Sequence, residues 1–382
     1  MPALRFPTNS KILYSIVGAR PQFIKSKPLH RAILSDPYLD SNTTLQEFLI
    51  HTNQHSRADM SNAFFKELDL PPPLHTLPQA PLNLSPLKHV AFMFAKLKEF
   101  CQTQRPDYLI VYGDTNSTLA GALCAYSLKI PLIHIEAGLR SGDLSMPEER
   151  NRILTDQLST LLFCPTPSAY ACLKQEQRLG QKIYWSGDVM LDNVRFFAPK
   201  AHPPKPSFEP SKKPFIFATW HRASNIDNMD NLQSIFKALE YLAQNAPLFL
   251  ALHPRTQNAL TQCGLSFKNV SLLPPLSYLE TLYMLTYARL VLTDSGGLQK
   301  EACFLGTPVL VMRENSEYPE LLEGGGAILV GTHAGLITRK AQELLTKGQV
   351  SFANIDHFGK GASALHILQA IKEHACYLGS SG

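Results

Sequence analysis

The chain lacks the cysteine patterns that stabilise small secreted proteins or hold structural zinc. Its 382 residues contain seven cysteines, an odd number, and no two of them form a CxxC pair. Disulfide frameworks and structural zinc sites both depend on paired or closely spaced cysteines, so the sequence excludes both. We therefore expect reduced, buried thiols and no metal site.

Long hydrophobic runs and a strong charge of one sign are also missing. Apolar runs such as YLIVYG and LFLAL are far shorter than the ~20 residues of a membrane helix, and the start MPALRFPTNSK has no signal-peptide core. Lys and Arg number 36 against 31 Asp and Glu, so the net charge of +5 is too small to indicate binding to nucleic-acid phosphates. We expect a cytoplasmic protein whose partners include no membrane and no nucleic acid.

Three common cofactor and metal motifs are absent as well. No GxGxxG follows the first apolar run, and neither GxxxxGK[ST] nor HExxH occurs. These motifs hold dinucleotides, nucleoside triphosphates and catalytic zinc, respectively. The sequence therefore predicts no redox cofactor and no catalytic metal.

What the chain does have is a regular alternation of short apolar runs and amphipathic stretches. Runs such as KILYSIVG, YLIVYGD, RLVLTD and TPVLVM alternate with helix-length segments such as NLQSIFKALEYLAQ. Strands that read as continuous apolar runs are typical of parallel sheets with helices on both faces. The pattern predicts the α/β class with two Rossmann-like, doubly wound parallel-sheet domains.

A proline-rich segment separates the two sets of predicted strands. Residues 196–215, FFAPKAHPPKPSFEPSKKPF, interrupt every periodicity, as a linker or a surface excursion does. We place the domain boundary near residues 188 to 212. The last helical stretch, ALHILQAIKEHACYL, could complete either domain.

Ionisable and polar residues follow several predicted strands at the point where each strand ends. In open α/β sheets the ligand crevice lies at the carboxyl ends of the strands, so we expect these residues to converge on a cleft between the domains. For any single one of them, a helix cap or a solvated loop charge is the alternative. The strand-end residues are Arg20, Asp114, Glu136, His221, His253, Asp294 and Ser295.

The segment DSGGLQKEACFLG predicts an anion site. A strand ends, Gly296 and Gly297 allow a ligand to approach the backbone closely, and a helix begins with N–H groups suited to a phosphate. Glu301 lies about one turn into that helix, where it can accept hydrogen bonds from ribose hydroxyls. The alternative is that this glutamate only interacts with the helix dipole.

Two further helix starts carry charged residues. In GARPQFIK, Pro21 suits the first helical position, and Arg20 and Lys25 would place two positive charges beside an anion, unless Lys25 is solvated. In MPEERNR, Glu148 and Glu149 open a helix, either for catalysis or because carboxylates favour a helix N-terminus. Carboxylates beside cationic groups suit proton transfer at carbon coupled to departure of a phosphate leaving group.

Taken together, these segments resemble the non-hydrolysing UDP-N-acetylglucosamine 2-epimerase family. The resemblance extends along nearly the whole chain through GARPQFIK, TNQH, YGDTNSTLAGAL, HIEAGLRSGD, MPEERNR, LTDQ, SGDVMLD, HRASNID, LHPRT and LTDSGGLQKEA. It implies a fold like that of the GT-B glycosyltransferases, with an N-terminal domain of residues 1–187 completed by the helix at 362–382. A UDP-binding domain of residues 188–361, a homodimer and the absence of a cofactor are also implied.

The resemblance further implies a reaction and the residues that carry it. The C2 proton of a UDP-N-acetylhexosamine is removed, UDP leaves to give a 2-acetamidoglucal, and both add back with C2 inverted, which converts UDP-GlcNAc to UDP-ManNAc. The acid and base roles fall to Asp114, Glu136 and Glu148, whose individual assignments stay open, and His221 would help UDP depart. The residues implied in substrate and UDP binding are Arg20, Lys25, His253, Ser295, Gly296, Gly297 and Glu301.

Two positions depart from the family pattern. Family members commonly read HRxEN where this chain reads HRASN, so Ser224 replaces a glutamate. The common TERPE becomes SEYPE, so Tyr318 replaces an arginine expected near the phosphates. We expect one positive charge to be missing from the rim of the cleft.

The substrate and the outcome of the reaction stay open at this point. UDP-GlcNAc is the first choice of substrate, and UDP-2,3-diacetamido-2,3-dideoxyglucuronate is the second, because GARPQFIK and SGGLQKEA are closer to epimerases of that sugar. The alternatives are a hydrolysing variant that releases UDP and free N-acetylmannosamine, a catalytically silent nucleotide-sugar-binding protein, and a glycosyltransferase. The motifs HIEAGLRSGD and MPEE argue against the glycosyltransferase.

Overall fold

The computed structural model describes residues 10–36, 44–54, 64–81, 84–204, 214–346 and 352–380. The chain divides into two compact units, called unit 1 (Met1–Asn193 and His357–Gly382) and unit 2 (Val194–Asp356). The chain passes between them twice, within helix α7 (Val189–Phe197) and within the 3-10 turn η2 (Ile355–Phe358). No helix among the described residues is both long and apolar enough to cross a membrane.

Unit 1 is built on a parallel sheet of seven strands among its described residues. The strands lie in the order β3-β2-β1-β4-β5-β6-β7, and each pair of neighbours runs in parallel. The strands are β1 (Ser10–Val17), β2 (Thr44–His51), β3 (His75–Thr76), β4 (Tyr108–Tyr112), β5 (Leu132–Ile135), β6 (Leu161–Cys164) and β7 (Lys182–Trp185).

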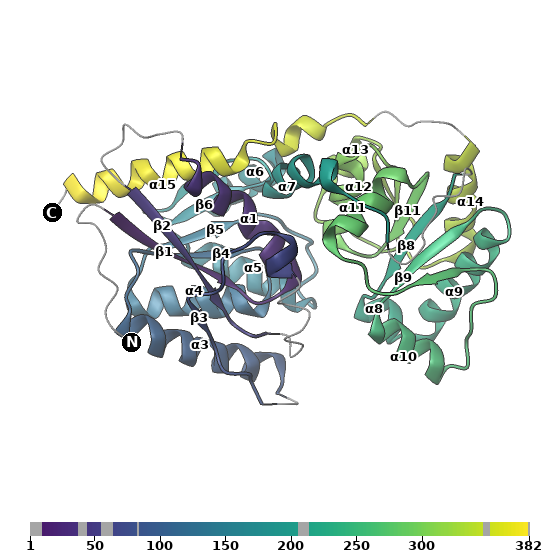
Figure 1. The fold of residues 1–382 in the computed structure, drawn as a ribbon, viewed down its shortest axis with the longest axis horizontal. Coiled ribbons are helices and arrows are strands. Elements are labelled where there is room, and N and C mark those ends of the chain that lie inside the picture. Colours follow the sequence, from purple (N-terminus) through teal and green to yellow (C-terminus); the bar gives the residue numbers. More distant parts are fainter. Residues whose placement is uncertain are drawn as a thin grey trace. The chain divides into compact units, whose positions relative to one another are not determined.

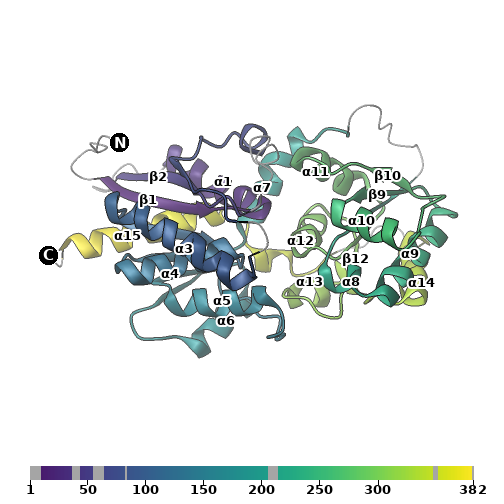
Figure 2. The same cartoon turned by 90° about the horizontal axis from the view of Figure 1, so that it is seen from below.

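Helices cover both faces of this sheet. Helix α15 packs against α1 on one face, and α3 packs against α4 on the other (Figures 1 and 2). The helices of unit 1 are α1 (Arg20–Leu34), α3 (Pro86–Thr103), α4 (Asn116–Leu128), α5 (Pro147–Leu158), α6 (Pro167–Glu176) and α15 (Ser363–Ser380), and a 3-10 turn, η2 (Ile355–Phe358), precedes α15. The core beneath α3 and α4 joins Leu97 and Ala120 to the strand residues Ile16, Leu109 and Val111, all fully buried.

A carboxylate of α7 ties the last helix to unit 1. Asp192 accepts hydrogen bonds from the backbone N–H groups of Ser363 (3.1 Å) and Ala364 (2.8 Å), the first residues of α15. These N–H groups have no partner within the helix, so the carboxylate acts as an N-terminal cap. Farther along α15, Lys372 forms an ion pair with Asp36 next to α1.

The described residues of unit 2 repeat the architecture with a six-stranded parallel sheet in the order β10-β9-β8-β11-β12-β13. Its strands are β8 (Ile216–Trp220), β9 (Leu248–Leu252), β10 (Ser271–Leu273), β11 (Leu290–Thr293), β12 (Val309–Val311) and β13 (Ala327–Leu329). Its helices are α8 (Ala223–Ile226), α9 (Met229–Ala243), α10 (Pro254–Gln262), α11 (Tyr278–Tyr287), α12 (Gly296–Phe304), α13 (Pro319–Glu323) and α14 (Ala334–Thr346), with a 3-10 turn, η1 (Ala198–Lys200), after α7. Ile235 of α9 and Ile337 of α14 pack with Leu250 and Leu292 in its core.

The predicted pair of doubly wound parallel sheets is confirmed. The proline-rich segment 196–215 was interpreted as a linker or a surface excursion. Its first residues differ from that interpretation, because residues 196–200 are helical in α7 and η1. Pro199 fits there because the first turn of a helix needs no N–H donor. Residues 205–213 of the segment lie outside the described residues.

Candidate functional site

The strand order locates the edge of each sheet where a ligand is expected. In unit 1 the order reverses between β1 and β4, and in unit 2 it reverses between β8 and β11. Ligands of open α/β sheets bind at the carboxyl ends of the strands at such switch points. In unit 1 the switch point is flanked by Gly18 and Asp114, and in unit 2 by His221 and Asp294.

Glu136 and Lys25 form a buried ion pair beside the switch point of unit 1. Lys25 Nζ lies 2.6 Å from Glu136 Oε1, and the two side chains are 11% and 5% exposed. Lys25 is one and a half turns into α1, and Glu136 follows the last residue of β5. The pair lies against Gly113, where an added Cβ would approach Lys25 Nζ to 2.9 Å. The alternative that Lys25 is solvated at the surface is therefore wrong.

Glu136 also adopts an uncommon backbone conformation. Its φ is +70°, in the left-handed region, although it is not a glycine. Such a conformation costs about 1 kcal/mol for an ordinary residue and persists only where the surroundings impose it. The backbone N–H groups of Glu136 and Ala137 both donate to the carbonyl oxygen of Phe163 on β6, at 3.1 and 3.0 Å, which holds this turn.

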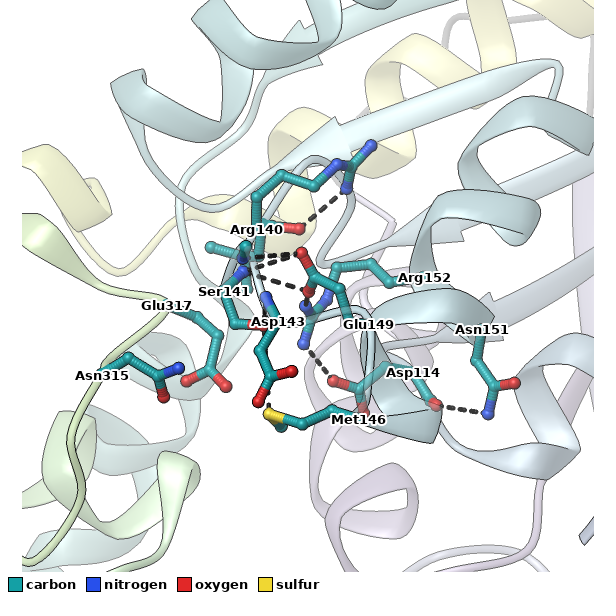
Figure 3. Close-up of polar contacts among 12 residues, drawn as sticks. Asp114, Arg140, Ser141, Asp143, Met146, Glu149, Asn151, Arg152, Asn315 and Glu317 are labelled. Carbon is teal, nitrogen blue, oxygen red and sulfur yellow. Dashed lines mark hydrogen bonds and ion pairs between the residues drawn. The ribbon is translucent and has the colours of Figure 1, made fainter.

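Asp114 lies at the end of β4 and is paired with an arginine of α5. Arg152 forms ion pairs with both Asp114 and Glu149, so one guanidinium lies between two carboxylates (Figure 3). Asn151 donates to the carbonyl oxygen of Asp114 at 3.0 Å. The side chain of Asp114 is 26% exposed, whereas that of Arg152 is 4% exposed. Arg152 and Asn151 belong to the MPEERNR segment but were not among the predicted site residues.

The two neighbouring glutamates of α5 have different surroundings. Glu149 is 1% exposed and accepts a hydrogen bond from the backbone N–H of Ser141 at 2.9 Å (Figure 3). It also accepts from the backbone N–H of Gly142 at 3.0 Å. Glu148 is exposed on the first turn of the same helix. Glu149 thus anchors the loop before α5, whereas the side chain of Glu148 is exposed to solvent.

Arg20 begins α1, and a buried glutamine occupies the backbone donors before it. Gln22 Oε1 accepts from the N–H groups of Gly18 (2.9 Å) and Ala19 (3.1 Å). The Arg20 guanidinium lies over the ring of Phe64, with its Cζ atom 4.7 Å from the ring centroid. The cationic side chain of Arg20, rather than the loop N–H groups, is therefore what this corner offers to an anion.

In unit 2, a fully buried carboxylate organises the turn after β8. Asp294 accepts from the backbone N–H groups of His221 (3.1 Å) and Arg222 (2.8 Å) and from the Asn225 side chain (3.2 Å). His221 Nδ1 lies 3.4 Å from Asp294 Oδ1, and the His221 side chain is 40% exposed. The His221 ring also lies beside that of His253, with centroids 5.6 Å apart.

The helix starts of unit 2 show which strand-end residues are caps. Ser295 Oγ accepts from the N–H of Leu298 (3.5 Å) at the start of α12, and His253 Nδ1 accepts from the N–H of Arg255 (3.1 Å) at the start of α10. Ser295 and His253 therefore both act as helix caps, which was the alternative role considered for strand-end residues. Neither cap prevents the residue from also contacting a ligand. Apart from its chain neighbours and the backbone of α12, no described atom lies within 4 Å of a Cβ added to Gly297, so the backbone at the start of α12 is open to close approach. Such an N-terminus suits a phosphate.

Glu301 and Lys300 are buried on α12. Glu301 is 3% exposed and Lys300 is 1% exposed. Lys300 Nζ lies 4.7 Å from the centroid of the Tyr318 ring, and Tyr318 itself is 5% exposed. The residue that replaces the family arginine therefore packs inside unit 2 beneath a lysine ammonium, in a cation–π contact.

The second departure, Ser224, lies in the short helix α8 and is exposed. Its carbonyl oxygen accepts a hydrogen bond from the Asn231 side chain at 3.1 Å.

Glu317 forms ion pairs with two arginines of unit 2. Arg222 Nη2 lies 3.8 Å from Glu317 Oε1, and Arg313 forms a two-pronged ion pair with Glu317 at 2.8 and 2.7 Å. Burial raises the pKa of Glu317, but the hydrogen bonds and the charge of Arg313 outweigh it and hold this pKa below its ordinary value.

The described part of the chain contains no group of three or more His, Cys, Asp or Glu side chains arranged to hold a metal ion. Its site residues instead pair carboxylates with cations. In unit 1 Asp114 pairs with Arg152 and Glu136 with Lys25, while Arg20 lies over the ring of Phe64. In unit 2 a histidine pair accompanies the open start of α12. This chemistry suits proton transfer in unit 1 and anion binding in unit 2.

Comparison with known proteins finds relatives along nearly the whole chain. A sequence model of the family described as UDP-N-acetylglucosamine 2-epimerase matches residues 38–372. The UDP-2,3-diacetamido-2,3-dideoxy-D-glucuronate 2-epimerase of Pseudomonas aeruginosa is 44% identical over 343 residues, which cover 88% of this chain and 93% of that protein. A UDP-N-acetylglucosamine 2-epimerase homolog of Methanococcus maripaludis is 38% identical over 373 residues, covering 94% of this chain and 99% of that one.

A solved structure shares the fold. The Methanocaldococcus jannaschii UDP-GlcNAc 2-epimerase, crystallised in complex with UDP-GlcNAc and UDP, matches with a TM-score of 0.81 and 34% sequence identity. The match covers 95% of this chain and 99% of that chain. The similarity therefore extends over both units.

Proposed function

The chain belongs to the UDP-N-acetylglucosamine 2-epimerase family, and on this premise we propose that it inverts C2 of a UDP-activated 2-acetamido sugar. The observation that carries the proposal is the placement of two carboxylates, Asp114 and Glu136, beside the switch point of unit 1, each paired with a cation. A weakly acidic proton on carbon needs a base held in a fixed position, and both pairs hold their carboxylates in this way.

The proposed reaction has two half-steps. A carboxylate of unit 1 takes the C2 proton, the electron pair of that C–H bond forms the C1=C2 double bond, and the C1–O bond breaks so that UDP leaves with its electrons. In the return step a protonated group delivers a proton to the opposite face of C2 and a UDP oxygen attacks C1. Asp114, Glu136 and Glu148 are the candidates for these proton transfers.

Unit 2 is proposed to bind the UDP that leaves and returns. The open backbone at Gly297, the neighbouring Gly296 and the N-terminus of α12 suit the diphosphate, with Ser295 capping that helix. His221, held by Asp294, would stabilise the charge that develops on the leaving oxygen, and His253 lies beside it. Glu301 is proposed to accept hydrogen bonds from the ribose, and Arg20 and Lys25 of unit 1 to balance negative charge on the substrate.

Two sugars are candidates for the substrate. UDP-GlcNAc, which would become UDP-ManNAc, is the first, and it agrees with the family description and with the solved relative. UDP-2,3-diacetamido-2,3-dideoxyglucuronate is the second, and the 44% identity to the Pseudomonas aeruginosa enzyme specifically favours it. Both sugars carry a 2-acetamido group and an acidic position at C2, so the same carboxylates serve either one.

A proton NMR time course in deuterated water tests the proposal. Purified protein is incubated with each UDP sugar, and we expect loss of the C2 proton signal together with a 2-epimer that is still attached to UDP. Free sugar in place of the UDP epimer would identify a hydrolysing variant. Absence of exchange with both sugars, while UDP still binds, would leave only the silent nucleotide-sugar-binding function.

A homodimer and a cytoplasmic location complete the proposal. The family resemblance supports both, and the proposed use of a UDP sugar as substrate also supports the cytoplasmic location. Light scattering of the purified protein is expected to give the mass of two chains, and a concentration-independent mass of one chain would contradict the dimer.

A further inference from the structure

A histidine that no motif argument selected connects two parts of the unit 1 site. His134 lies in β5, two residues before Glu136, and is fully buried. Its Nδ1 lies 2.7 Å from Asp156 Oδ1 on α5, and its Nε2 lies 2.8 Å from the carbonyl oxygen of Gly113, the residue before Asp114. One ring thus joins a helix carboxylate to the turn that carries a proposed catalytic residue.

Asp156 is held as a carboxylate. Its second oxygen accepts from Arg140 Nη1 at 2.7 Å and from the backbone N–H of Gly138 at 3.2 Å. Arg140 is fixed in turn by Glu176, 2.7 Å away. Burial raises the pKa of Asp156, but the hydrogen bond and charge of His134 and the charge of Arg140 outweigh it and keep this pKa below its ordinary value.

Both nitrogens of the His134 ring therefore face acceptors. A carbonyl oxygen and an ionised carboxylate can only accept hydrogen bonds, so a ring that satisfies both must carry a proton on each nitrogen. A neutral ring would leave one nitrogen lone pair facing an oxygen inside a fully buried site, which is unfavourable. The hydrogen-bond geometry thus selects the imidazolium form.

The Gly113 turn depends on this contact. Gly113 has a φ of +63°, and its N–H donates to the carbonyl oxygen of Ile135 at 3.0 Å. With its own carbonyl bound to His134, the Gly113 residue is held to β5 from both ends. Because the ion pair of Lys25 and Glu136 lies against Gly113, a shift of this residue would change the position of Asp114 relative to Glu136.

We propose that His134, as an imidazolium paired with Asp156, is a positioning residue that holds the Gly113 turn and so sets the distance between the carboxylates of Asp114 and Glu136. Its effect on turnover rests on the proposed function, whereas its effect on the Gly113 turn does not. Misplacing a reacting group by about 1 Å can lower a rate by about 100-fold, so the contact can matter without touching the substrate.

The test compares three variants of the full chain. His134→Phe removes both hydrogen bonds and is expected to lower kcat by about 100-fold with little change in KM, because binding contacts are untouched. In Asp156→Asn the amide oxygen can keep the hydrogen bonds from Arg140 and Gly138, so that the amide N–H faces His134 Nδ1. The ring then becomes neutral with its proton on Nε2 and keeps the bond to Gly113. We expect a smaller loss in kcat, about 10-fold, because a neutral donor holds the carbonyl less strongly. His374→Phe is the matched control, since His374 is also buried in unit 1 but bonds Tyr108 at the other end of β4.

Two measurements distinguish positioning from general stabilisation. Nitrogen NMR of ¹⁵N-histidine-labelled protein should show both ring nitrogens of His134 protonated in the native protein and one of them unprotonated in Asp156→Asn. Hydrogen exchange of the Gly113 amide should be faster in His134→Phe and unchanged in His374→Phe. Neither readout requires turnover, so a failure of the proposed function is separable from a failure of this inference.

An unprotonated ring nitrogen in the native protein would overturn the imidazolium assignment. Native Gly113 exchange and native kcat in a folded His134→Phe would overturn the positioning role. If His134→Phe does not fold, Asp156→Asn decides instead, because native kcat in that variant together with an unchanged ring spectrum contradicts the proposal.

Discussion

Lys25 Nζ of α1 lies 2.6 Å from Glu136 Oε1 after β5, and both side chains are buried. Removing one member of a buried ion pair leaves the other charge without compensation, which typically costs about 3–5 kcal/mol. We expect Lys25→Met to lower the free energy of unfolding by this amount, as measured by urea denaturation.

The double variant Lys25→Met/Glu136→Gln provides the control for that prediction. It removes both charges, so we expect it to recover much of the lost stability while remaining inactive. A double-mutant cycle then isolates the pair energy. If the losses of the two single variants add up to the loss of the double variant, the two groups do not interact in solution.

The second prediction concerns the carboxylate at the end of β4. Asp114→Asn should lower kcat at least about 100-fold while the affinity for UDP stays within about twofold, because the residue is proposed to act on the sugar. Glu136→Gln should behave in the same way. Asp107→Asn is the matched control, since Asp107 precedes the same strand at its opposite end and bonds Lys11. Native turnover in both Asp114→Asn and Glu136→Gln would refute the site assignment.

The third prediction separates UDP binding from chemistry. Glu301→Ala should weaken UDP binding by about 10-fold or more, measured by titration calorimetry, because hydrogen bonds to a charged acceptor are lost. Glu323→Ala, an exposed glutamate of the same unit, should bind UDP as the native protein does. An unchanged UDP affinity in folded Glu301→Ala would remove the proposed ribose contact.

The fourth prediction tests the departure at Tyr318. Its buried ring lies under Lys300, so restoring the family arginine with Tyr318→Arg would place two positive charges together in a buried site. We expect a loss of about 1–3 kcal/mol in unfolding free energy, whereas Tyr318→Phe keeps the ring and should be close to native. Equal stability of Tyr318→Arg and Tyr318→Phe would show that the Lys300 contact contributes nothing.

The fifth prediction is a pH dependence of stability. Burial lowers the pKa of His51 from 6.5 to about 4. Between these values the unfolded chain binds more protons than the folded chain, so the free energy of unfolding falls as pH falls below 6.5. From pH 8 to pH 5 this residue alone should cost about 2 kcal/mol.

His51→Phe provides the measurement for that prediction. The His51 ring stacks on Phe23 with centroids 5.4 Å apart, so a phenyl ring can keep the contact without titrating. Urea denaturation of the variant at both pH values should show a pH dependence flatter by about 2 kcal/mol. An identical slope for variant and native protein would mean that His51 does not titrate as described.

The sequence predicted the sheets well where apolar runs were long. Runs such as YLIVYGD and RLVLTD became β4 and β11, because strands buried on both faces must be apolar throughout. The short edge strands β3 and β13 were not anticipated, since two or three residues carry no readable period. The helical start of the proline-rich segment was also missed, because α7 continues to Phe197.

The sequence by itself determined the family, the class of fold and the positions of the strand-end residues, because motifs and apolar periodicity are local properties of the chain. Only the tertiary structure decided their partners. Arg152 meets Asp114 across 38 residues, and Asp156 meets His134 across 22. The phase of α5 buries Glu149 and exposes its neighbour Glu148, which no local pattern distinguishes. Such pairings depend on how helices dock on a sheet, and docking is a property of the packed chain rather than of any one segment.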